Sequence, residues 1–201
     1  MTYSFDRAVM RPGDIVHRRS YSTIGWAIRN ALGNGCWGNH DALWIPRLNY
    51  DYIGDAQPPR AVLTEISDYE SDMDRGRCEC RVYRPAGATP IDGIAAGNWW
   101  RQNVLGIWYD LSAFPDMLYR SSRFGRLLVK ALWGDRWPEQ WEWAWYCTEG
   151  ISRAWQVAGG IDIYGAKLQP TPLTTEKRLA SGQLTDVTAD AIISQRSRKI
   201  G

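Results

Sequence analysis

Residues 141–155 read WEWAWYCTEGISRAW, and the other parts of the sequence are interpreted relative to this stretch. An aromatic, strand-like run ends at Cys147, after which Thr148 and Glu149 suit the first turn of a helix. Apolar residues then recur at helical spacing until a Gly-Gly pair ends the pattern. The spacing therefore predicts that Cys147 lies at the N-terminus of a helix.

A cysteine in this position has the properties expected of a nucleophile. Unpaired backbone N–H groups at a helix N-terminus favour the thiolate form and can bind a developing oxyanion. The alternative is that Cys147 is a small buried residue in a tryptophan-rich core, as most free cysteines are. A nucleophilic cysteine also needs a base, and the chain offers only His17 and His40.

The composition limits the classes of function. A chain of 201 residues suits one sizeable core, which we assign to residues 1–169. Residues 170–201 form a polar C-terminal tail with too few apolar residues for a core of its own, so an ordered tail would need the domain or a protein partner to pack against. A net charge of +2, with no dense basic stripe before the extreme C-terminus, argues against nucleic-acid binding.

The hydropathy pattern predicts a soluble protein with no transmembrane segment. No apolar run reaches the roughly eighteen residues that a spanning helix needs, and the N-terminal sequence lacks the apolar region of a Sec signal. Four cysteines in a chain of this size do not indicate a disulfide scaffold. A reduced, cytoplasmic location is therefore the default expectation.

Short strands and helices are predicted to alternate along the chain. The predicted strands cover residues 14–18, 40–45, 61–67 and 77–84. The predicted helices cover residues 22–32, 90–105, 111–134 with a break at Pro115, 147–158 and 175–180. Residues 1–12 are expected to be irregular, 49–60 an excursion loop and 68–74 a solvated acidic turn. His40 thus begins a strand beside a glycine-rich loop.

The order of these segments resembles the YiiX/YebB-like branch of the NlpC/P60 superfamily, the circularly permuted papain-like cysteine hydrolases. The matching segments are RPGDIVHR at 11–18, NHDALWI at 39–45, VLTEI at 62–66, LGIWYD at 105–110, WYCTEGISRAW at 145–155 and, near the end, TPLTTEKRLASGQLTDV. The resemblance implies an α+β fold with an antiparallel sheet packed against helices and the nucleophile at a helix N-terminus. Two departures stand close to the site: the family typically has Cys-Ser-Glu and Ser-His where this chain has Cys147-Thr148-Glu149 and Asn39-His40.

The resemblance also implies the roles of the site residues. Cys147 is the nucleophile, His40 the base, and Glu65 the third member that orients the imidazole. Thr64 or Asp68 could take the place of Glu65, since a glutamate on a strand is usually solvated. His17 is interpreted as a strand residue that pairs with a neighbour.

The implied reaction is acyl transfer to water through a thioester, which hydrolyses an amide or an ester. The usual substrate of NlpC/P60-like proteins is a peptide bond in peptidoglycan, and permuted members include lipid acyltransferases and thioesterases. A phage or virion-associated cell-wall hydrolase fits this expectation. The alternative is a structural component of a phage tail or virion that keeps the fold as a docking module. The tryptophans near the site are expected mostly in the core, although they could line a sugar or peptide groove: Trp99, Trp100, Trp108, Trp141, Trp143 and Trp145.

A zinc site is the main competing interpretation. Cys36 and His40 have three residues between them, and Cys78 and Cys80 could complete a Cys₃His set, although a ligand pair at positions i and i+2 of a strand is unusual. A disulfide from Cys36 to Cys78 or Cys80 is a further alternative in an exported protein. We predict neither a metal nor a cofactor.

Overall fold

The computed structural model describes residues 2–32, 36–46, 51–109, 127, 130, 131, 147–165 and 170–195. At its centre lies a six-stranded sheet with the order β5-β4-β3-β2-β6-β7, in which every neighbouring pair is antiparallel. Its strands are β2 (Ile15–Ser20), β3 (His40–Pro46), β4 (Asp51–Ala56), β5 (Ala61–Glu65), β6 (Cys78–Pro85) and β7 (Leu184–Asp186).

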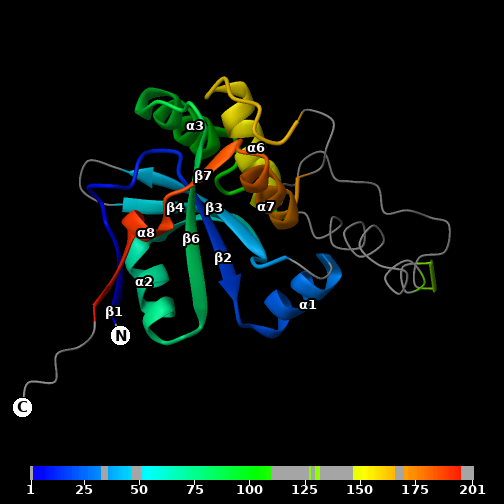
Figure 1. The fold of residues 1–201 in the computed structure, drawn as a ribbon. Coiled ribbons are helices and arrows are strands. Elements are labelled where there is room, and N and C mark those ends of the chain that lie inside the picture. Colours follow the sequence, from blue (N-terminus) through cyan, green and yellow to red (C-terminus); the bar gives the residue numbers. More distant parts are fainter. Residues whose placement is uncertain are drawn as a thin grey trace, which may run out of the picture.

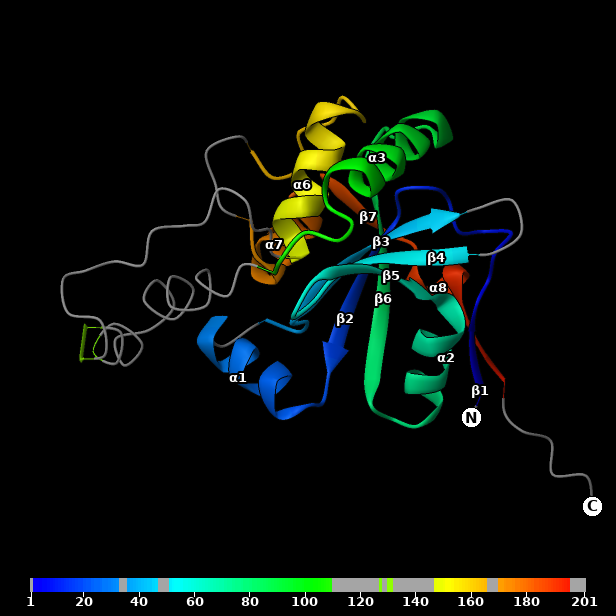
Figure 2. The same ribbon diagram turned by 180° about the vertical axis from the view of Figure 1, so that it is seen from behind.

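Helices cover both faces of this sheet (Figure 1). On one face, α3 (Pro90–Asn103) and α6 (Cys147–Val157) pack against alternate strand residues such as Leu43 and Ile45. On the other face, α2 (Ile66–Asp74) packs against the residues between them, such as Trp44. Successive side chains of a strand point to opposite faces, so β3 supplies both cores. The view from behind in Figure 2 shows the same separation of α3 and α6 from α2.

The described strands and helices confirm most of the predicted elements. β2, β3, β5 and β6 lie within two residues of the predicted strands, and α1 (Thr23–Leu32) begins after Ser22, whose hydroxyl accepts a hydrogen bond from the Gly25 N–H at 3.0 Å. That bond caps the N-terminus of the helix. The helix predicted at 111–134 falls almost entirely outside the described residues.

Two segments that were expected to be irregular are regular. Residues 51–56 of the expected excursion loop form β4, an inner strand of the sheet. A Cβ at Gly54 would lie 2.7 Å from Ile45 and 3.0 Å from the Trp100 ring, so the glycine serves packing inside a strand. The expected acidic turn at 68–74 belongs to α2, because Ile66, Tyr69 and Met73 are buried at helical spacing while Asp68 and Asp74 are exposed.

The C-terminal segment is part of the domain, in contrast to the polar tail expected for residues 170–201. Its first described elements are α7 (Pro172–Ala180) and β7, which pairs with β6 at the edge of the sheet. After α8 (Thr188–Ala191), β8 (Ile192–Gln195) pairs with β1 (Thr2–Phe5), so residues expected to form an irregular lead-in make a second, two-stranded sheet. The packing of this segment could not be predicted from its polar composition, because an edge strand and a half-exposed helix each bury few side chains.

In the part of the chain that the structure describes, no helix combines the length and the apolar character that crossing a membrane requires.

Candidate functional site

His40 and Asp55 form a buried pair across neighbouring strands. Nε2 of His40, at the start of β3, lies 2.5 Å from Oδ1 of Asp55, near the end of β4. The Asp55 side chain is 1% exposed and that of His40 is 15% exposed, so the carboxylate is shielded while one side of the imidazole remains accessible. A carboxylate in this arrangement fixes both the orientation and the tautomer of the ring.

The second oxygen of Asp55 is also held. The Tyr69 hydroxyl donates to Oδ2 at 2.8 Å, and the Thr64 hydroxyl lies 3.5 Å from the same atom. The Arg18 guanidinium lies 4.7 Å from the centre of the Tyr69 ring. Burial alone would raise the pKa of Asp55, but the charge and hydrogen bond of His40, the Tyr69 bond and the nearby Arg18 lower it. Asp55 is therefore an anion with a fixed orientation.

Cys147 is the first residue of α6 and its side chain interacts with His40. Burial opposes a charge on His40, but the Asp55 carboxylate, the charge of the Cys147 sulfur and hydrogen bonds to both residues raise the pKa of His40 well above its usual value. Cys147 is 4% exposed. The fold therefore brings together the cysteine and the histidine that the sequence had paired, although 107 positions, the difference between 147 and 40, separate them.

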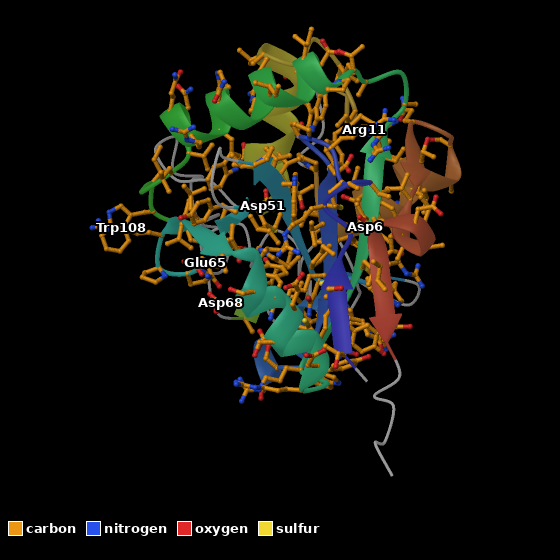
Figure 3. The ribbon with its side chains drawn as sticks, turned by 90° about the vertical axis from the view of Figure 1, so that its left-hand side faces the viewer. Asp6, Arg11, Asp51, Glu65, Asp68 and Trp108 are labelled. Carbon is orange, nitrogen blue, oxygen red and sulfur yellow. The ribbon has the colours of Figure 1, made fainter. Side chains whose placement is uncertain are left out.

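Glu65, the expected third member, lies elsewhere. It is exposed at the junction of β5 and α2, where its carboxylate accepts a hydrogen bond from the Ser67 hydroxyl at 3.4 Å. Figure 3 shows Glu65 and Asp68 on the outer surface by the start of α2. The carboxylate that contacts His40 is Asp55, and of the alternatives to Glu65 only Thr64 takes part, by contacting Asp55. Asp55 was missed because its strand had been interpreted as a loop.

A second buried cluster surrounds His17, on the opposite face of β2 from Arg18. Nδ1 of His17 lies 2.6 Å from Oδ1 of Asp41, and Nε2 lies 3.2 Å from Oε1 of Glu176. Burial lowers the pKa of His17, but the charge of Asp41 and the hydrogen bonds to both carboxylates raise it to about 9. His17 is therefore an imidazolium between two anions, which goes beyond the structural strand role expected of it.

The same cluster joins three separate segments of the chain. Backbone N–H groups of Trp37 and Gly38 donate to Glu176 at 2.5 and 3.0 Å, so the loop before β3 is bound to α7. A Cβ at Gly38 would lie 2.2 Å from Nε2 of His17, so only glycine fits there. Hydroxyls of Thr148 and Thr175 both donate to Oδ2 of Asp41 at 2.8 Å, which adds α6 to the assembly.

The residues of the competing zinc interpretation lie apart. The Cys36 thiol donates to the Gly38 carbonyl at 2.9 Å, whereas Cys78 and Cys80 lie on β6 in the core beside α2. All four cysteines are free and buried, so none of the proposed disulfides is present. Within the described residues, no three or more histidine, cysteine or acidic side chains are grouped so that they could hold a metal ion.

Three of the six tryptophans singled out in the sequence are described. Trp100 is fully buried and Trp99 packs partly buried against the same core, as expected. Trp108 is 47% exposed and projects outward in Figure 3. The Arg60 guanidinium carbon lies 4.2 Å from the centre of the Trp108 ring. Trp141, Trp143 and Trp145 lie outside the described residues.

Comparison with solved structures defines the fold as YiiX-like, a mixed α+β arrangement of antiparallel strands and helices. One similar structure is the crystal structure of metalloprotein yiiX from Escherichia coli O157:H7, DUF1105. The two chains are 17% identical with a TM-score of 0.54, and the match covers 92% of this chain and 97% of that one. No protein-family model matches the chain, and a comparison with curated proteins found none that match. The YiiX-like part of the resemblance is thus confirmed at the level of the fold.

Proposed function

We propose that this protein is a cysteine hydrolase that uses Cys147, His40 and Asp55. One observation carries the proposal: the His40 imidazole is hydrogen-bonded to the buried Asp55 carboxylate and interacts with the Cys147 thiol at the start of α6. A nucleophile, a base and a group that orients the base are the parts that thiol-dependent acyl transfer requires. The order along the chain, histidine before cysteine, is that of a permuted papain-like enzyme of the NlpC/P60 superfamily, which remains part of the proposal.

In the proposed reaction, the proton passes from Cys147 to His40. Nε2 of His40 is bonded to Asp55, so Nδ1 is the nitrogen left to receive the Cys147 proton. The raised pKa of His40 favours the imidazolium that this transfer creates. The thiolate then attacks the substrate carbonyl carbon, a C–S bond forms, and the carbonyl electron pair moves onto oxygen.

Collapse of the tetrahedral intermediate breaks the bond to the leaving group, which takes the proton from His40. Water then attacks the thioester as His40 removes a proton from it, and this step releases the acid and restores the thiol. The developing oxyanion would be bound by the backbone N–H of Cys147, aided by the positive end of the α6 dipole.

The substrate class is inferred from the family resemblance alone. The resemblance implies that the bond cleaved is an amide in the peptides of bacterial peptidoglycan. Acyl esters of lipids are the alternative, as in permuted relatives. The E. coli protein is described as a metalloprotein. The described residues of this chain contain no group suited to hold a metal ion, and no step of the proposed reaction passes through one.

Trapping of the acyl-enzyme tests this function. An excess of an activated acyl ester should add one acyl group to the protein, and peptide mapping by mass spectrometry should locate it on Cys147. The Cys147→Ala and His40→Ala variants should not accumulate the adduct. A panel of peptidoglycan, muropeptides and phospholipid vesicles then identifies the bond that is turned over. Acylation spread equally over all four cysteines would contradict the proposal and favour a docking role for the fold.

A further inference from the structure

Asp41 joins the first turn of α6 to the strand that carries His40. Its Oδ2 accepts the Thr148 hydroxyl at 2.8 Å, and Thr148 immediately follows Cys147. Asp41 itself immediately follows His40 in β3. This dipeptide of β3 therefore contacts Asp55 through His40 and Thr148 of α6 through Asp41. This short covalent link sets how far Cys147 can lie from His40.

The anchor is rigid because both oxygens of Asp41 are engaged in a fully buried setting. Oδ1 contacts the His17 imidazole at 2.6 Å, while Oδ2 accepts the two threonine hydroxyls. Asp41, His17 and Thr148 are each no more than 1% exposed. A buried carboxylate with charged and hydroxyl partners has few alternative rotamers, so its position is transmitted to whatever it binds.

The Thr148 hydroxyl also lies next to the reacting group. Its oxygen is 3.7 Å from the Cys147 sulfur, and its single proton is directed to Asp41. Displacement of Thr148 would therefore move both the backbone of the first turn of α6 and an atom in contact with the sulfur.

We propose that Asp41 is a positioning residue for Cys147, acting through the Thr148 hydroxyl and held in place by His17 and by Glu176 and Thr175 of the C-terminal segment. This inference rests on the proposed function, because it assumes that the Cys147 thiol is paired with His40. The Asp41 carboxylate contacts His17, Thr148 and Thr175. Its effect is to hold the nucleophile at the correct distance from its base, where misplacement by about 1 Å is costly.

The two threonines provide a matched pair of variants. Thr148→Val and Thr175→Val each remove one hydroxyl from the same Asp41 oxygen, with the same 2.8 Å bond and the same complete burial, but only Thr148 adjoins Cys147. Thr148→Ser keeps the hydroxyl and serves as the rescue variant. The measurement is the rate at which iodoacetamide labels each cysteine of the full chain at pH 7, followed by mass spectrometry, together with thermal unfolding.

We expect both valine variants to lower Tm, Thr175→Val at least as much as Thr148→Val, because the Thr175 hydroxyl also contacts the Tyr164 hydroxyl at 3.1 Å. Thr148→Val should slow labelling of Cys147 about tenfold, Thr175→Val less than about threefold, and Thr148→Ser should stay within about twofold of the wild type. Loss of stability alone would act in the opposite direction, because transient opening exposes all four buried cysteines and speeds their labelling together. The internal comparison with Cys36, Cys78 and Cys80 therefore separates positioning from folding.

Equal rates in the two valine variants, or faster labelling of Cys147 in Thr148→Val, would overturn the inference. His40→Ala keeps this outcome distinct from failure of the proposed function. If His40→Ala leaves the Cys147 rate unchanged, the proposed pairing of thiol and imidazole is wrong. If His40→Ala slows labelling and Thr148→Val does not, the pairing stands and only the role of Asp41 is rejected. Should a valine variant fail to fold, Thr148→Ala and Thr175→Ala provide the same comparison.

Discussion

His40 and Asp55 lie in hydrogen-bond contact, Nε2 to Oδ1 at 2.5 Å, although each is fixed by a different strand and Asp55 is buried beneath Tyr69. The pair occupies the junction between the sheet and α6, where Cys147 completes the group. The buried Asp55 carboxylate and the Cys147 thiol thus both interact with the His40 imidazole. This arrangement makes the following outcomes expected.

The role of Asp55 can be separated from that of Glu65 with isosteric amides. Asp55→Asn removes the charge beside His40, so we expect labelling of Cys147 by iodoacetamide at pH 7 to slow by about tenfold or more. Glu65→Gln changes an exposed carboxylate away from the site and should leave the rate within about twofold. Equal effects of the two substitutions would show that Asp55 is not the residue that orients His40.

The stability of the protein should fall at alkaline pH because of His17. Its pKa is about 9 in the folded state and 6.5 unperturbed, so its contribution is fully present below pH 6.5 and is lost as the pH rises through about 9. That shift corresponds to roughly 3 kcal/mol for this fully buried group. Urea unfolding followed by circular dichroism from pH 6 to pH 10 measures the fall.

The His17→Gln variant is the control for this pH dependence. It should be less stable than the wild type near pH 6, and its stability should decline less between pH 6.5 and 9. Part of the decline should remain, since the pKa of His40 is raised as well. An equally steep decline in His17→Gln would show that His17 is not the group responsible.

Two glycines of α3 should respond oppositely to alanine. A Cβ at Gly93 would lie 1.8 Å from the Pro12 carbonyl oxygen, so Gly93→Ala should destabilise the fold by about 2 kcal/mol or more. A Cβ at Gly97 would meet only Ile45 at 3.7 Å, and Gly97→Ala should stabilise by about 0.5–1 kcal/mol through helix propensity. Thermal unfolding of the two variants measures the contrast. Destabilisation by both substitutions would contradict the prediction that α3 has room for a Cβ at position 97.

Removal of the C-terminal segment should unfold or strongly destabilise the domain. Deletion of residues 170–201 takes away β7 and leaves His17 and the Trp37 and Gly38 N–H groups without Glu176. Loss of one partner from a buried ionic cluster costs about 3 kcal/mol or more. A chain shortened only by residues 196–201 retains β8 and is the matched control. A stable, fully folded 1–169 fragment would restore the original assignment of a separate tail.

Local patterns in the sequence were sufficient for most of the secondary structure and for two members of the candidate site. Helical spacing after Cys147 predicted α6, and a polar residue opening an apolar run placed His40 at the start of β3. Both signals are local, because the start of a helix or a strand depends on the few residues that flank it.

The tertiary structure decided which carboxylate reaches His40 and what holds the nucleophile. Asp55 follows a glycine that resembles a turn signal. Gly54 fits inside the strand because Ile45, on the neighbouring strand, and Trp100, distant in sequence, fill the space left by the missing side chain. The cluster of His17, Asp41 and Glu176 joins residues from opposite ends of the chain. Sequence alone fixes periodicity and capping, whereas burial of a charge beside its partner is determined only when the strands are paired and the C-terminal segment is packed.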